Sequence, residues 1–173
     1  NCCRAGRDLR VKVSGLGRGF RSRCVAAGAQ QRALLDDVYQ RFAINPAKLA
    51  FIEAHGTGTR AGDPIETWAL GQALGQRRET PLPIGSAKTN VGHLEAGSGL
   101  VGLLKAQLAL ENNLLPASLH FTDPNPDIKF DEWNLSVAAE PTPLPRQDAP
   151  HYAGVNSFGF GGQNNTLVVQ RFA

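Results

Sequence analysis

The chain has 173 residues, of which 42% are hydrophobic and 19% are charged, so a single packed domain is expected rather than a disordered polypeptide. Its net charge is only +3, and seven basic residues lie within the first 23 positions, so the rest of the chain is near neutral, which argues against a nucleic-acid-binding protein. No apolar run approaches the ~20 residues that a membrane-spanning helix requires, and the first residues are charged, unlike a signal peptide.

The first 24 residues form a basic segment without a sustained apolar period, and only a short strand around Leu9 to Val13 is indicated there. We therefore separate residues 1–24, as an uncertain N-terminal segment, from a domain at residues 25–173. The segment also contains all three cysteines, Cys2, Cys3 and Cys24. An odd number of cysteines without metal-ligand spacing predicts reduced thiols in a cytoplasmic protein.

A helix, a strand and a second helix are predicted next. Residues Ala26–Phe42 place apolar side chains at three- and four-residue spacings, which is typical of an amphipathic helix. Leu49–Ala54 has the composition of a short buried strand, and it leads into a glycine-rich turn at residues 55–59. Asp63 as N-cap then predicts a helix that continues to about Leu74.

The second half of the chain continues this alternation. A strand is predicted at Pro83–Ser86, followed by a polar loop and a long helix at Ala96–Glu111. Residues 115–150 are spaced by prolines and contain one strand candidate, Asn134–Ala138, which suits a surface or neighbour-contacting region. The last two predicted strands form a hairpin at Ala153–Ser157 and Thr166–Phe172. Helices that alternate with strands before a closing hairpin indicate an α/β domain.

Two histidines are the strongest candidates for chemistry. His55 and His93 each follow a predicted strand beside glycines, where a side chain can project into a cleft. Lys88 precedes His93 in the same loop, and the hydroxyls of Thr57 and Thr59 follow His55. Two imidazoles and an ammonium suit the stabilisation of a developing oxyanion or enolate, because a neutral imidazole donates one N–H.

Two alternatives stand beside this interpretation. Each histidine taken alone is more simply a hydrogen-bonded structural residue. A metal site would also use two imidazoles, but no third ligand lies at a recognisable spacing, and Lys88 would add positive charge to the site. The sequence therefore predicts no metal.

Three motifs in succession resemble the signatures of β-ketoacyl synthases, the ketosynthases. Residues 53–59 read Glu-Ala-His-Gly-Thr-Gly-Thr, with Gly-Asp-Pro-Ile-Glu at 62–66. Residues 85–95 read Gly-Ser-Ala-Lys-Thr-Asn-Val-Gly-His-Leu-Glu, and residues 156–162 read Asn-Ser-Phe-Gly-Phe-Gly-Gly. The wording of these motifs, together with Asn-Pro-Asp-Ile at 125–128, is most similar to ketosynthase domains of modular type I polyketide synthases. Dissociated fatty-acid condensing enzymes are the alternative relatives.

The resemblance implies a thiolase-like α/β fold, of which this chain forms the C-terminal half, a mixed sheet with helices packed on it. It implies an acyltransferase that catalyses decarboxylative Claisen condensation of an acyl thioester with a malonyl-type acyl carrier protein, in polyketide or fatty-acid biosynthesis. No cofactor of its own is implied, because phosphopantetheine is carried by the acyl carrier protein. The implied partners are that carrier protein, the N-terminal ketosynthase half and a second copy in a homodimer of the complete domain.

The resemblance also implies roles for single residues. His55 and His93 would bind the malonyl thioester carbonyl and stabilise the enolate, while Lys88 would orient the site. Thr57 and Thr59 match hydroxyls that contact the phosphopantetheine arm, although turn and cap hydrogen bonding is the alternative for each.

Two further roles concern the acyl pocket and the long helix. Phe160 resembles the phenylalanine that gates the acyl pocket, and Gly161 would let its loop swing. Phe158 is interpreted as a packing residue. Glu95 is interpreted as a carboxylate that complements the N-terminus of the long helix.

The cysteine nucleophile of the family is missing from this sequence. In the family it lies in an Asp-Thr-Ala-Cys-Ser-like stretch upstream of the first histidine, and Cys24 lacks that context, so an unreactive thiol is expected there. The isolated chain is therefore expected to be inactive and to expose an apolar face where the N-terminal half packs. The alternatives are a non-catalytic truncated fragment that binds a carrier protein or synthase subunit, and a thiolase relative acting on coenzyme A thioesters.

Overall fold

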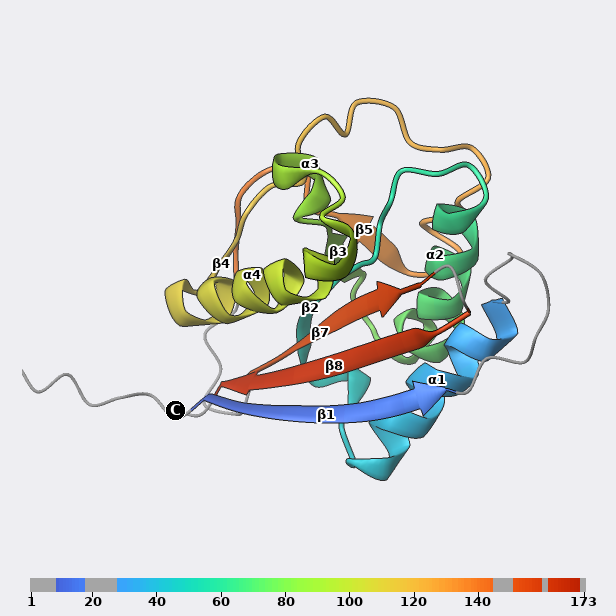
Figure 1. Ribbon diagram of the computed structural model, residues 1–173. Helices are drawn as coiled ribbons and strands as arrows, with labels where there is room; N and C mark the ends of the chain where they lie inside the picture. Colours follow the sequence, from blue (N-terminus) through green and yellow to red (C-terminus); the bar gives the residue numbers. More distant parts are fainter. Residues whose placement is uncertain (1–8, 18–27, 145–150, 160–161, 172–173) are drawn as a thin grey trace, which may run out of the picture.

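The computed structural model describes residues 9–17, 28–144, 151–159 and 162–171. These residues form a six-stranded mixed sheet with helices packed on it (Figure 1). The strands lie in the order β1-β8-β7-β2-β3-β5. Their bounds are β1 (Leu9–Gly17), β2 (Leu49–Glu53), β3 (Leu82–Gly85), β5 (Leu135–Val137), β7 (His151–Phe158) and β8 (Asn164–Arg171). A separate two-stranded sheet pairs β4 (Leu114–Leu115) with β6 (Thr142–Pro143).

The parallel strands of the large sheet end at one edge. β2 runs parallel to β3 and β7, β5 runs parallel to β3, and β8 is antiparallel to β7 and β1. Glu53, the last residue of β2, pairs with Gly85 of β3 and with Val155 of β7. Loops that leave the carboxyl ends of neighbouring parallel strands meet, so the residues after β2, β3 and β7 share one region.

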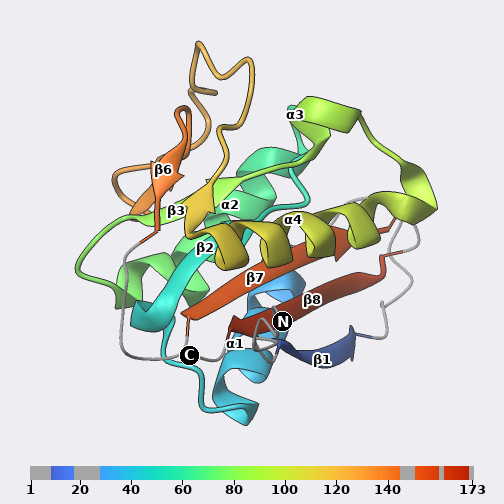
Figure 2. The same ribbon diagram turned by 90° about the vertical axis from the view of Figure 1, so that its left-hand side faces the viewer.

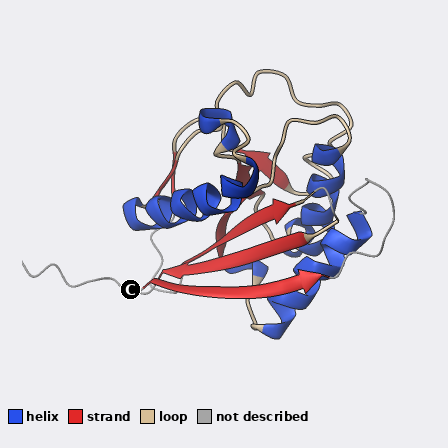
Figure 3. Cartoon of the chain, viewed as in Figure 1, coloured by secondary structure: helices blue, strands red, loops and turns tan. Residues whose placement is uncertain are grey.

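Helices cover both faces of this sheet (Figure 2 and Figure 3). The long helices are α1 (Gly28–Arg41), α2 (Gly62–Ala73) and α4 (Ser98–Asn112). Because successive strand residues face opposite sides, Ile52 packs in the core with α1 and α2, whereas Phe51 packs in the core beneath α4. Val168 and Val169 divide in the same way. The predicted α/β class, with helices packed on a mixed sheet, is confirmed.

Short helical turns connect these elements. They are η1 (Pro46–Lys48), η2 (Gly75–Arg77), α3 (Lys88–Val91) and η3 (Glu95–Gly97). The loop predicted around Lys88 is thus a turn of helix. The predicted long helix begins at Ser98, after η3, and residues 115–150 contribute to β4 and β6 besides β5. Among the described residues, no helix is long and apolar enough to cross a bilayer.

The predicted N-cap of α2 is wrong, because the helix begins at Gly62 and Asp63 lies inside its first turn. The N–H of Gly62 donates instead to Thr59 Oγ1 at 3.0 Å. The Asp63 carboxylate accepts the N–H of Gly58 at 3.2 Å. The loop before α2 folds back toward the helix, so a hydroxyl reaches the first helical N–H and the carboxylate turns to the loop.

Gly71 permits the close approach of α2 to the segment around Trp133. A methyl group at Gly71 would lie 2.4 Å from Trp133 Cβ and 3.1 Å from Trp133 Cα. We predict that Gly71→Ala lowers the free energy of unfolding by about 1–3 kcal/mol, since backbone must move to relieve the overlap. Urea unfolding measures this change. In Gly97→Ala, where the nearest atom would be Leu94 Cβ at 3.5 Å, the change should stay below about 1 kcal/mol; equal losses in both variants would contradict the packing argument.

Candidate active site

His55 lies just beyond β2, and a buried carboxylate holds its loop. Glu66 of α2 accepts the N–H of His55 at 2.8 Å and the N–H of Gly56 at 2.9 Å. The side-chain amide of Asn156, on β7, donates to the same carboxylate at 3.1 Å. Burial raises the pKa of Glu66, although these three N–H donors act in the opposite direction. One side chain of α2 thus joins the exits of β2 and β7.

Asp63 continues this arrangement along the first turn of α2. Its carboxylate lies one turn before Glu66 and accepts the N–H of Gly58. Asp63 and Glu66, three residues apart on one helix face, therefore both accept hydrogen bonds from the loop after β2. The loop needs glycine twice, because φ is +44° at Gly56 and +73° at Gly58, in the left-handed region that favours glycine. Burial raises the pKa of Asp63 as well.

His93 stands on an exposed loop between α3 and η3. Its Nδ1 accepts the N–H of Glu95 at 3.0 Å and lies 3.0 Å from Ser98 Oγ. Since a backbone N–H can only donate, Nδ1 must present its lone pair there, and the proton of the neutral ring is on Nε2. His93 therefore offers an N–H donor from Nε2. Glu95, predicted to complement the helix dipole, lies in η3 and fixes His93 through its backbone.

The two histidine rings meet, although they are 38 positions apart in the sequence. The ring centroids of His55 and His93 are 5.5 Å apart, and the ring planes are at 88°. Phe158, at the end of β7, lies 5.4 Å from the His55 ring. Phe158 therefore packs, as the sequence indicated, and the residue it packs against is His55.

Lys88 adds a positive charge beside these rings. It is the first residue of α3, three positions after β3, and burial lowers its pKa while Glu66, Glu53 and Asp63 act against that change. Burial, followed by the charges of Lys88 and His93, lowers the pKa of His55 to about 4. The His55 ring is therefore neutral at neutral pH and keeps one N–H to donate.

Thr57 and Thr59 also lie in the His55 loop. Their hydroxyls are 3.2 Å apart, and Thr59 Oγ1 accepts the N–H of Gly62. Thr57 is half-buried and Thr59 is exposed. The remaining two predicted site residues, Phe160 and Gly161, lie outside the described residues.

The sequence interpretation missed the residues that hold the histidines. Glu66 and Asp63 were assigned only to the start of a helix, and Asn156 was given no role. The spacing of two carboxylates three residues apart on one helix face was a usable signal. The contacts of Glu66 with His55 and of Asp63 with Gly58 were not predictable, because they form only when the loop folds back on α2.

The arrangement can stabilise negative charge on an oxygen. The His93 ring is held by the N–H of Glu95 at Nδ1, and the His55 ring is placed by its backbone contact with Glu66. With an ammonium nearby, the two rings place donors around one small region, and fixed donors in a partly dry site stabilise an oxyanion strongly. Among the described residues, no three His, Asp or Glu side chains converge as metal ligands.

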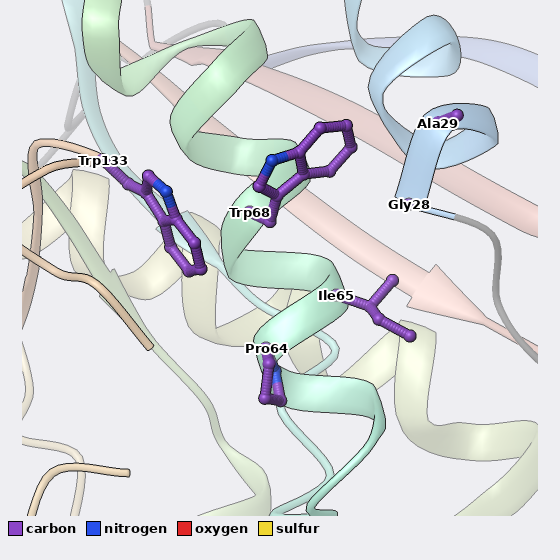
Figure 4. Close-up of a pocket in the computed structure, with 6 residues that line it drawn as sticks. All are labelled: Gly28, Ala29, Pro64, Ile65, Trp68 and Trp133. Carbon is purple, nitrogen blue, oxygen red and sulfur yellow. The ribbon is translucent and has the colours of Figure 1, made fainter. Parts of the chain in front are cut away.

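A shallow apolar hollow of about 380 Å³ lies elsewhere on α2 (Figure 4). It is lined by Gly28, Ala29, Pro64, Ile65, Trp68 and Trp133. None of these side chains is titratable or nucleophilic, so the hollow offers no chemistry.

The fold defines a class of protein, the thiolase-like α/β domains. The chain belongs to the β-ketoacyl synthase C-terminal domain family, which matches residues 11–122, and the ketoacyl-synthetase C-terminal extension matches residues 124–172. The ketosynthase resemblance of the sequence is thus confirmed.

Relatives and solved structures agree with this membership. The chain is 48% identical over 143 residues to a highly reducing polyketide synthase of Aspergillus terreus, covering 82% of this chain and 6% of that protein. It is 49% identical over 142 residues to the polyketide synthase GfsA of Streptomyces halstedii, covering 80% and 2%. Ketosynthase twelve of the bacillaene polyketide synthase from Bacillus amyloliquefaciens superposes with a TM-score of 0.82 at 34% identity, covering 95% of this chain and 29% of that chain.

This chain therefore spans less than a third of the relatives and structures named above. It is similar to the C-terminal half of ketosynthase domains from modular type I polyketide synthases, and the thiolase-like fold is confirmed.

Replacing His55 with glutamine should remove part of the pH dependence of stability. The pKa of His55 in the folded chain is about 4, below its ordinary value of 6.5, so the unfolded state binds protons first as the pH falls. Stability that His55 contributes above its ordinary pKa is therefore lost as the pH falls toward 4. Relative to His55→Gln, the wild type should lose about 1–2 kcal/mol between about pH 7 and about pH 4.5, a value discounted for the solvent that reaches the ring.

Urea unfolding at several pH values measures this difference. His120→Gln, which removes an imidazole from an exposed loop, is the matched control and should follow the wild type. Parallel pH curves for the wild type and His55→Gln would contradict the burial of the His55 ring.

Proposed function

We propose that this chain forms one half of the active site of a β-ketoacyl synthase, which catalyses decarboxylative Claisen condensation. The observation that carries the proposal is the pairing of His55 and His93, whose ring centroids are 5.5 Å apart at the edge where the parallel strands end. Lys88 lies at the same edge, on the turn that follows β3. The membership of the chain in the ketosynthase family supports the choice of reaction.

The histidines act on a malonyl group carried as a thioester on the phosphopantetheine of an acyl carrier protein. Neutral His93 donates from Nε2 and neutral His55 donates its single N–H, and both bonds go to the thioester carbonyl oxygen. The C–C bond to the carboxylate breaks, carbon dioxide leaves, and the electron pair forms an enolate whose oxygen the two N–H groups stabilise. Lys88 adds positive charge that favours the enolate over the ground state.

The enolate carbon then attacks an acyl group held as a thioester on a cysteine. A new C–C bond forms, and the cysteine leaves as a thiolate. That cysteine belongs to the N-terminal ketosynthase half, because the cysteines of this sequence lack the family context.

Thr57 and Thr59 contact the phosphopantetheine arm. The half-buried hydroxyl of Thr57 is 3.2 Å from that of Thr59, which already accepts from Gly62, so Thr57 has more capacity to bind a ligand. The family resemblance assigns Phe160 and Gly161, which lie outside the described residues, to the gate of the acyl pocket.

The N-terminal half packs on an apolar face of α4. Leu100, Leu104 and Leu108 recur every fourth residue and are 67%, 57% and 56% exposed. The opposite side of α4 is buried on the sheet, and a helix that is apolar all round is normally covered on all sides. Val91 and Leu94, which flank His93 in the sequence, are exposed as well. The same partner would therefore complete the active site.

The wider setting follows from these partners. Residues 25–173 form most of the ketosynthase C-terminal domain, and the N-terminal segment adds β1 (Leu9–Gly17), which pairs with β8 at the edge of the same sheet. The complete domain is a cytoplasmic homodimer in polyketide or fatty-acid biosynthesis, and its only prosthetic group is the one on the carrier protein.

Decarboxylation tests the roles of the histidines. Combined with the N-terminal half of a related ketosynthase, the chain should release carbon dioxide from a malonyl-carrier thioester. His55→Ala should lower that rate about 100- to 1000-fold, the usual effect of removing one oxyanion donor. His120→Ala, in an exposed loop, is the control. A His55→Ala complex that decarboxylates as fast as the wild type would refute the assignment.

Association tests the apolar face. Leu104→Gln should weaken binding to the N-terminal half about 10- to 100-fold, since burying one leucine side chain contributes about 1.5–3 kcal/mol. Titration calorimetry measures the Kd, and Gln40→Ala, at an exposed position of α1 on the other face of the sheet, is the control. The two variants binding equally well would place the partner elsewhere.

The second candidate function is non-catalytic. A truncated ketosynthase that binds a carrier protein or synthase subunit without turnover would use the same exposed leucines, which favours this reading for the chain alone. The decarboxylation assay with the N-terminal half separates the two, because release of carbon dioxide that depends on His55 would contradict a non-catalytic role.

A further inference from the structure

A buried ion pair lies directly behind the candidate site. Glu53 Oε2 and Lys105 Nζ are 2.6 Å apart, and their side chains are only 4% and 11% exposed. Burial raises the pKa of Glu53, while Lys105 and a backbone N–H act against that change. A buried pair of this kind has a large desolvation cost, so its contribution to stability alone is a weak explanation for its presence.

The second oxygen of Glu53 reaches the segment that carries Lys88. Oε1 accepts the N–H of Ala87 at 2.5 Å, and Ala87 is the residue immediately before Lys88. Glu53 itself is two residues before His55, at the end of β2. One carboxylate therefore connects the strand that carries His55 to the first turn of α3.

Lys105 connects the same carboxylate to α4. It lies on the helix that begins with Ser98, whose Oγ is 3.0 Å from His93 Nδ1. The Glu53 carboxylate thus joins the strand before His55, the residue before Lys88 and the helix whose first residue contacts His93.

Two glycines make room for this pair. A methyl group at Gly102 would lie 3.2 Å from Glu53 Cγ, and one at Gly85 would lie 3.4 Å from Lys105 Nζ and 2.8 Å from Ser118 Oγ. Both distances to the pair are shorter than or at the limit of ordinary van der Waals contact, so the backbone of β3 and α4 closes around the ion pair.

We propose that Glu53, held by Lys105, is a positioning residue that fixes the start of α3 and thereby the place of Lys88 beside His55. This inference rests on the proposed function, since it assigns Lys88 and His55 to one active site. Glu53 acts through the N–H of Ala87, and Lys105 acts by neutralising and orienting the carboxylate.

Two double variants separate positioning from the burial of charge. E53L/K105M removes both charges and leaves the Ala87 N–H without its acceptor. E53Q/K105M also removes both charges, but the glutamine amide oxygen can still accept that N–H. Neither leaves an unpaired charge in the core, so both are expected to fold, and circular dichroism checks this. Arg77→Met, which breaks the exposed 2.6 Å pair with Asp36, is the control for loss of an ion pair.

The first readout is decarboxylation by the chain combined with an N-terminal ketosynthase half. E53L/K105M should lower kcat about 100-fold with little change in KM, because a misplacement of about 1 Å costs about that much. The kcat of E53Q/K105M should be at least about tenfold higher than that of E53L/K105M, and the kcat of Arg77→Met should equal that of the wild type. A wild-type kcat in E53L/K105M, or an equal loss in both double variants, would overturn the proposal.

The second readout uses the chain alone and needs no activity. NMR titration of the His55 ring reports the place of Lys88, because burial, Lys88 and His93 set its pKa at about 4. Glu66, from α2, accepts the backbone N–H of His55, and it is unchanged in every variant. The pKa of His55 should rise toward its ordinary 6.5 in E53L/K105M but stay near 4 in E53Q/K105M and Arg77→Met.

The two readouts distinguish the two hypotheses. If the wild-type complex releases no carbon dioxide, the proposed function fails, while the His55 titration still decides whether Glu53 positions Lys88. If the wild type is active and the pKa of His55 is the same in both double variants, only the positioning role fails.

Discussion

The geometry of the site depends on a carboxylate that is removed from water and surrounded by N–H donors. Glu66 accepts from His55 and Gly56 at the exit of β2 and from Asn156 on β7, so the loop after β2 and a strand 90 positions away converge on one helix turn. A buried carboxylate must find such partners, because leaving it unpaired would cost several kcal/mol. The requirement that Glu66 be satisfied therefore fixes the backbone from which the His55 ring projects.

The protonation of the rings follows from where that backbone puts them. His55 is partly buried near an ammonium, which holds its pKa at about 4, and His93 has its Nδ1 committed to the N–H of Glu95. Burial and charge leave the His55 ring neutral with one N–H, and the hydrogen bond to Nδ1 leaves His93 an N–H donor at Nε2.

Within the described part of the chain, α4 is packed against the sheet on one side and exposed to solvent on the other. Ala106, Ala109 and Leu110 are buried on the sheet, whereas Leu100 and Leu104 face solvent. This asymmetry agrees with the share of the solved ketosynthases that the chain covers, less than a third of their length. The exposed His93 lies between Val91 and Leu94, which are exposed as well.

The sequence by itself determined the alternation of helices and strands, the closing hairpin, and the family to which His55, Lys88 and His93 point, because local periodicity and short motifs are written in neighbouring residues. The ends of elements were less well determined: Asp63 is not the N-cap, because the hydroxyl of Thr59, three positions before the first helical residue, accepts the N–H of that residue instead. Only the tertiary structure decided that Glu66 and Asn156 support His55 and that Glu53 meets Lys105. Those contacts join residues far apart in the chain, and a single sequence records which side chains exist but not which of them burial brings together.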